Sequence, residues 1–141
     1  NALKASGGGN WLDFVEFWQI GSNPNRLSLY VIYDSAQDKY ILRLQCRDDG
    51  AGVNLWQVNQ EASMISWDTW HTLSMQVETT GDGPTDGLVK VWVDGNLVVN
   101  KTGELGYPIL NVNYFKLYTS SASMAHDHVE MRYDDLFIYK K

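Results

Sequence analysis

The sequence is poor in cysteine, in cationic residues and in long apolar runs, and each shortage excludes a class of protein. Cys46 is the single cysteine, so the chain makes no intramolecular disulfide and has no cysteine-based zinc site. With 11 Lys and Arg against 17 Asp and Glu, the net charge is −6, which argues against binding to nucleic acid or to an anionic membrane surface. No apolar run approaches the roughly eighteen residues of a membrane-spanning helix, so membrane insertion is not expected.

The sequence also lacks an initiating Met and an apolar signal segment, since it starts at Asn1. It contains no repeat, no low-complexity tract and no amphipathic helical pattern. Its 141 residues are enough for one domain with its own core. We therefore expect a single domain over residues 1–141, excised from a larger secreted or cell-surface protein with flanking domains.

Period-two alternation of apolar and polar residues is the main pattern that is present, and it predicts strands. The expected strands are 1–6, 11–20, 27–34, 40–47, 53–58, 70–78, 88–94, 97–99, 113–119 and 129–139. In the cleanest of them, Leu42, Leu44 and Cys46 alternate with Arg43, Gln45 and Arg47. About ten strands at this spacing predict an all-β sandwich of two antiparallel sheets.

Two local patterns refine this expectation. Asp94-Gly95 separates two alternating runs, which predicts a tight hairpin because Gly tolerates positive φ. Residues 11–20 carry apolar side chains in both phases, which predicts either cover on both faces or a bulge that switches the phase. Cys46 is in phase with Leu42 and Leu44, so we expect it to be buried as a small apolar residue.

Aromatic residues make up 13% of the chain, with six Trp and eight Tyr, which is more than a core of this size needs. Flat rings on a surface bind the flat apolar faces of sugars. One hypothesis is therefore a stacking platform formed by Trp18, Tyr30, Trp56 and Trp92. The alternative is that at least two of these rings belong to the core.

A second set of outward residues combines planar donors with aromatic rings. The set consists of Arg43, Gln45, Arg47, Trp92, Tyr114, Lys116 and Tyr118. If their strands share a sheet, the rings can stack on sugar CH faces while the donors bind hydroxyls and carboxylates. We predict a carbohydrate-binding face here, and its cations favour an anionic polysaccharide. The alternative is an ordinary solvated sheet face with cross-strand polar pairs.

Three segments resemble the concanavalin A-like lectin and glucanase superfamily, which includes laminin-G-like domains, laminarinase-type glucanases and alginate-lyase-type polysaccharide lyases. Trp70-His71, followed later by 91–95 (VWVDG), is similar to its signature hairpin. Residues 133–139 (YDDLFIY) are similar to its closing strand, and 114–116 (YFK) to a strand of the alginate-lyase type. The resemblance implies a jelly roll with a glycan on its concave sheet. Members usually have one more strand ahead of residues 1–6, so this chain either lacks that strand or does not need it.

The resemblance also implies one structural calcium. The acid of the closing strand maps to Asp134, with Asp135 beside it. Leu136 and Ile138 set the inward phase of that strand, which predicts Asp134 at the end of the inner face. A carboxylate there needs a partner, and calcium takes such oxygen ligands.

The same resemblance argues against catalysis. Alginate-lyase-type enzymes place Gln and His two residues apart, but here Arg47 follows Gln45 and is a poor base. Those enzymes also have Tyr six residues after the first Tyr of YFK, where this chain has Ser120. In the laminarinase-type pattern of three acids, Asp13 and Glu16 match, but Trp11 stands in the nucleophile's place.

We therefore predict a non-catalytic, lectin-like module that binds a polysaccharide on the concave sheet face or in adjoining loops. One alternative is a polysaccharide lyase or glycoside hydrolase, active or degenerate. The third possibility is a laminin-G-like adhesion domain that binds protein.

Overall fold

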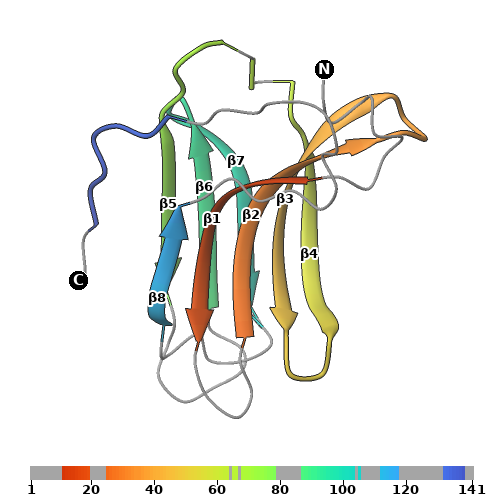
Figure 1. Ribbon diagram of the computed structural model, residues 1–141, viewed down its shortest axis with the longest axis vertical. Coiled ribbons are helices and arrows are strands. Elements are labelled where there is room, and N and C mark those ends of the chain that lie inside the picture. The colour runs from red at the N-terminus through yellow and green to blue at the C-terminus, as the bar shows by residue number, and fades with distance from the viewer. Residues whose placement is uncertain are drawn as a thin grey trace.

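The computed structural model describes residues 11–19, 25–63, 65–66, 68–78, 87–103, 105, 112–117 and 132–138. These residues form eight strands and no helix, and the strands make two antiparallel sheets (Figure 1). The prediction of an all-β sandwich is therefore confirmed. No helix that could cross a membrane occurs in this described part of the chain.

The larger sheet has five strands in the order β4-β3-β2-β1-β8. Their bounds are β1 (Trp11–Gln19), β2 (Asn25–Asp34), β3 (Lys39–Asp48), β4 (Val53–Glu61) and β8 (Val112–Leu117). The smaller sheet has the order β5-β6-β7, with β5 (Leu73–Glu78), β6 (Gly87–Val93) and β7 (Asn96–Gly103).

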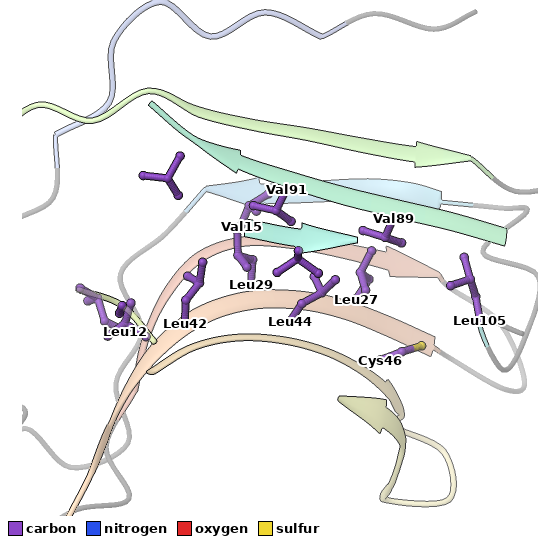
Figure 2. Close-up of a cluster of buried hydrophobic side chains, with 14 of the residues drawn as sticks. Leu12, Val15, Leu27, Leu29, Leu42, Leu44, Cys46, Val89, Val91 and Leu105 are labelled. Atoms are coloured by element: carbon purple, nitrogen blue, oxygen red, sulfur yellow. The ribbon is translucent and has the colours of Figure 1, made fainter. Parts of the chain in front are cut away.

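The core lies between the two sheets, where one phase of each alternating strand is buried (Figure 2). The five-stranded sheet contributes Leu27, Leu29, Leu42, Leu44 and Cys46, and the three-stranded sheet contributes Val89, Val91, Val93 and Val99. The expected burial of Cys46 is confirmed, and burial raises the pKa of its thiol to about 12. The buried phase fixes the opposite phase of the same strands on the outer face.

The strands of the five-stranded sheet arch toward the three-stranded sheet, so their outer face is concave (Figure 2). A bulge between Asp13 and Val15 shifts the register of β1 against β2. Asp13 therefore pairs with Tyr30, while Val15 pairs with Leu29. The bulge explains the apolar residues in both phases, and it was one of the two interpretations that the sequence allowed.

The Asp94-Gly95 hairpin is confirmed, with φ of 49° at Asp94 and 78° at Gly95. Positive φ at both central residues is the geometry that suits a two-residue connection between twisted strands. The Asp94 carboxylate anchors the preceding segment: its Oδ1 accepts from the Thr72 backbone N–H at 2.8 Å, and its Oδ2 lies 2.7 Å from His71 Nδ1. The turn residue thereby ties the start of β5 to the end of β6.

Two predictions about secondary structure were wrong. β7 continues to Gly103 rather than ending at residue 99, because it stays paired with β6 to Gly87. Residues 132–138 of the expected closing strand are not a strand, and Leu136 and Ile138 are 56% and 65% exposed. Alternation specifies which face a strand can bury but supplies no neighbouring strand. The segment instead contacts β1 through Tyr133 Oη, which donates to the Phe14 carbonyl at 3.1 Å. Residues 1–6 lie outside the described residues.

We expect Leu44→Ala to lower the free energy of unfolding by about 2–5 kcal/mol, because Leu44 is fully buried and the change leaves a cavity. Urea unfolding followed by tryptophan fluorescence measures this loss. The matched control is Leu97→Ala, a half-exposed position at which the same substitution should cost less than about 1 kcal/mol. Equal losses at both positions would contradict the assignment of the core.

The His71–Asp94 pair predicts a pH-dependent contribution to stability. The hydrogen bond to Asp94 raises the pKa of His71 above 6.5, and the bond from His71 lowers the pKa of Asp94 below 3.8. The His71 contribution is present below its unfolded pKa and is lost as pH rises through the raised value. The Asp94 contribution is present above its unfolded pKa and is lost as pH falls through the lowered value. The difference in unfolding free energy between wild type and Asp94→Asn should therefore be largest between pH 3.8 and 6.5 and shrink on either side. A difference that does not change with pH would show that the pair carries no charge interaction.

Candidate functional site

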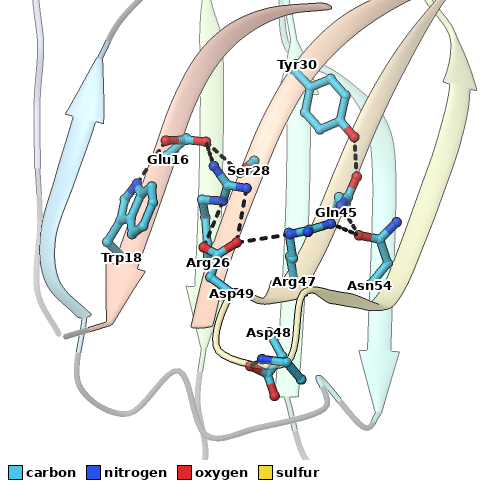
Figure 3. Close-up of polar contacts among 11 residues, drawn as sticks. Glu16, Trp18, Arg26, Ser28, Tyr30, Gln45, Arg47, Asp48, Asp49 and Asn54 are labelled. Carbon is cyan, nitrogen blue, oxygen red and sulfur yellow. Dashed lines mark hydrogen bonds and ion pairs between the residues drawn. The ribbon is translucent and has the colours of Figure 1, made fainter. Parts of the chain in front are cut away.

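The pairing of β2 with β3 places three pairs of outward residues across the middle of the concave face. The pairs are Tyr30 with Arg43, Ser28 with Gln45, and Arg26 with Arg47. On the far side of β3, the strand β4 continues these rows with Asn59, Gln57 and Asn54. The uninterrupted β2–β3 register therefore assembles a polar surface from side chains that are far apart in the sequence (Figure 3).

The first group is centred on the phenol of Tyr30. Its Oη donates to Gln45 Oε1, and the Gln45 amide nitrogen donates to Asn54 Oδ1. Arg43 lies with its guanidinium carbon 5.9 Å from the Tyr30 ring centre, while its Nε donates to Asn59 Oδ1 at 2.8 Å. Burial raises the pKa of Tyr30 above 10.0, and the hydrogen bond and charge of Arg43 oppose that rise.

The second group is a carboxylate held between two guanidinium groups. Asp49, in the turn between β3 and β4, lies 3.2 Å from Arg26 Nη2 through Oδ1 and 3.2 Å from Arg26 Nε through Oδ2. Its Oδ1 also accepts from Arg47 Nε at 3.0 Å. Arg47 Nη1 donates to Asn54 Oδ1 at 3.2 Å, which joins this group to the first (Figure 3).

Glu16 is a buried acid that anchors the site from β1. It is 1% exposed and accepts hydrogen bonds from Trp18 Nε1 at 2.8 Å, Ser28 Oγ at 3.0 Å and Arg26 Nη1 at 3.1 Å. A buried carboxylate is tolerated when it is paired and hydrogen-bonded in this way. Glu16, which matched an acid of the laminarinase-type pattern, therefore positions Arg26 and Trp18 in this structure.

The Trp18 ring lies among cations on the same face. The Arg26 guanidinium carbon is 4.9 Å from the ring centre, and Lys116 Nζ is 4.4 Å from it. Such contacts attract a cation to the face of the ring. Trp18 therefore holds two positive side chains next to the polar rows. Of the other rings in the suggested stacking platform, Tyr30 shares this face, whereas Trp56 donates from Nε1 to the Leu105 carbonyl at 2.7 Å.

The structure brings together four of the predicted carbohydrate-binding residues and separates a fifth from them. The four that share one sheet are Arg43, Gln45, Arg47 and Lys116. Tyr114, on β8 of the same sheet, pairs with Trp18 on β1. The prediction that Trp92 joins this group is wrong, because β6 belongs to the other sheet. Tyr118 lies outside the described residues.

Arg26, Asp49 and Asn54 were not among the predicted site residues. Alternation along β2 carries a signal for Arg26, which shares the outward phase of Ser28 and Tyr30. Asp49 has no such signal, since it looks like an ordinary turn acid until the fold places it between two arginines.

The predicted calcium ligands lie in the segment 132–138. Asp134 and Asp135 are exposed there, and Asp134 Oδ1 accepts from the Asp135 backbone N–H at 2.9 Å. The expectation that Asp134 ends an inner face is wrong, because Leu136 and Ile138, which were to set that face, are exposed. Within the described residues, no group of three or more His, Cys, Asp or Glu side chains could hold a metal ion. Calcium binding stays a prediction.

A cavity of about 1010 Å³ lies elsewhere, beside β5 and the segment 132–138. Apolar side chains such as Leu12, Phe14 and Leu117 form much of its wall. Among its described lining residues, His71 is engaged by Asp94 and by Ser66, whose backbone carbonyl oxygen lies 3.1 Å from Nε2. The concave face suits a hydrated polymer better, because it presents guanidinium, amide and phenol groups.

Comparison with known proteins supplies the class of ligand. The sequence model of the polysaccharide lyase family matches residues 5–128, a range that includes all eight strands. No curated protein and no solved structure matches the chain significantly. This match supports a polysaccharide as the partner, and it supports the lyase alternative better than the non-catalytic module favoured by the sequence motifs. Since the match spans most of the chain, the protein belongs to the polysaccharide lyase family.

Proposed function

We propose that this chain is a lyase that cleaves a uronic acid-containing polysaccharide by β-elimination on the concave face. The observation that carries the proposal is the position of the Tyr30 phenol. Tyr30 is on β2, and its side chain lies next to Arg43 and Gln45 on β3. β2 is the middle strand of the five-stranded sheet, so Tyr30 is central to the face in a chain of this family.

The charge of the concave face supports an acidic substrate. Arg26, Arg43, Arg47 and Lys116 gather there although the whole chain has a net charge of −6 and only 11 Lys and Arg. Guanidinium groups bind carboxylates through two parallel hydrogen bonds and stay protonated. Arg43 has Asn59, a neutral residue, as its hydrogen-bond partner, so its charge is available to a sugar carboxylate.

Tyr30 can perform the proton transfers of an elimination at one uronate unit. As the phenolate it removes the proton from C5, next to the carboxylate, and the electron pair forms the C4=C5 double bond. The bond from C4 to the glycosidic oxygen breaks, and that oxygen takes the proton that Tyr30 has just accepted. Arg43 favours the phenolate and, like the Gln45 amide, can bind the carboxylate, which makes C5 more acidic.

We expect Tyr30→Phe to abolish the formation of unsaturated uronate product, measured by its ultraviolet absorbance, while polymer binding is retained.

Because the pKa of Tyr30 is raised above 10.0, kcat/KM of the wild type should rise about tenfold per pH unit from neutral pH into the alkaline range. Arg43→Gln should move this rise to higher pH, since Arg43 lowers the pKa of the phenol. Wild-type turnover that persists in Tyr30→Phe would refute the role of Tyr30.

A second function, non-catalytic binding of the same polymer, has one observation in its favour. Among the described residues of the concave face there is no histidine. Glu16 and Asp49 are paired with Arg26 and Arg47, and Asp13, which lies opposite Tyr30, is buried. Polymer binding without any unsaturated product from the wild type would establish this function instead. The secreted or cell-surface location expected from the sequence fits either function.

A further inference from the structure

We infer that Arg26 and Arg47 form a second anion-binding subsite for an acidic group of the polysaccharide, and that Asp49 occupies this subsite in the free protein. The inference rests on the proposed function for the acidity of the substrate. Beyond the proposed function, the inference states where a second acidic group of the polymer binds and which residue of the protein competes with that group.

The first support is the geometry around Asp49. Its two oxygens lie 3.0–3.2 Å from three guanidinium nitrogens, two on Arg26 and one on Arg47. This is the arrangement that two arginines adopt around a carboxylate or sulfate ligand. Figure 3 shows the Asp49 carboxylate between the two arginines on the concave face.

The second support is that Asp49 fills the subsite imperfectly. Asp49 Oδ2 and Arg26 Nε are buried and 3.2 Å apart, yet neither has a hydrogen-bond partner among the described residues. Their contact is an ion pair without hydrogen-bond geometry. A ligand carboxylate that approaches Arg26 in line with Nε–H can make the hydrogen bond that Asp49 does not make.

The third support is that Asp49 can leave while the arginines stay. Asp49 belongs to the turn at residues 49–52, and Gly50, Ala51 and Gly52 are exposed. The Asn54 side chain holds Arg47, while the Glu16 carboxylate and the Trp18 ring hold Arg26. Glu16 itself is 1% exposed on β1 and is paired with Arg26, so it stays with that arginine when Asp49 leaves. Displacement of Asp49 therefore uncovers one net positive charge in a preformed site.

The position of this subsite indicates the class of polymer. Arg26 and Tyr30 are on the same face of β2, four residues apart, which is about 13 Å along the strand. The Ser28–Gln45 pair lies between them. This separation is longer than one sugar ring, so the acidic group at Arg26 and Arg47 belongs to a different unit from the one at Tyr30. The substrate class is a polysaccharide that carries acidic groups on more than one of its units.

The test compares two substitutions in the same turn, Asp49→Asn and Asp48→Asn. Both remove one negative charge, but Asp48 only accepts the Ala51 backbone N–H at 2.9 Å, which Asn can also do. Binding is measured by titration calorimetry with polygalacturonate, alginate and a neutral β-glucan as probes. We expect Asp49→Asn to tighten binding of at least one acidic polymer about threefold to tenfold, and Asp48→Asn to leave it unchanged. Binding of the neutral glucan should not change in either variant.

Arg47→Gln added to Asp49→Asn should remove the gain, and thermal unfolding should show that all variants are folded. The inference would be overturned if Asp49→Asn bound acidic polymer no more tightly than the wild type, or if no variant bound acidic polymer. It would also be overturned if Asp48→Asn gained as much affinity as Asp49→Asn, or if the neutral glucan gained as much as the acidic polymers. This readout is binding, so it is separate from the proposed function, which fails if the wild type binds acidic polymer but forms no unsaturated product.

Discussion

The antiparallel pairing of β2 with β3 is the constraint on which the rest of the structure depends. Ten residue pairs run from Asn25↔Asp48 to Asp34↔Lys39 without a bulge. On one side, this pairing aligns the leucines that pack against the valines of the smaller sheet. On the other side, it aligns Tyr30 with Arg43 and Arg26 with Arg47. A slip of one residue would exchange the two faces, so core burial and site assembly are enforced together.

The concave face carries a cluster of positively charged side chains in a protein whose net charge is negative. Glu16 and Asp49 compensate Arg26 and Arg47, but they do so from different surroundings. Glu16 is enclosed within the sheet, whereas Asp49 reaches in from a turn. The first carboxylate stabilises the arrangement of the strands, and the second is the one that, in our proposal, an acidic group of the ligand displaces.

Local pattern explains why much of the fold was predictable. Alternation located β1 to β6 and β8 to within a few residues, and Asp94-Gly95 located the tight hairpin. It also placed Arg43, Gln45 and Arg47 on one outward face. The failures share one cause: alternation assigns a face within a strand but not a neighbour. Trp92 was therefore assigned to the wrong sheet, and Leu136 and Ile138 were expected in a strand that the structure does not show.

The sequence alone determined the all-β class, the buried phase of each central strand and the cationic outward residues of β3, because these depend on period-two geometry and on hydrophobic burial. The tertiary structure alone decided which strands are neighbours, and therefore that Tyr30 meets Gln45 and that Asp49 lies between Arg26 and Arg47. The Tyr30–Gln45 and Arg26–Asp49 contacts join residues 15 and 23 positions apart. They depend on pairing and on the arching of a whole sheet, which no local sequence pattern encodes.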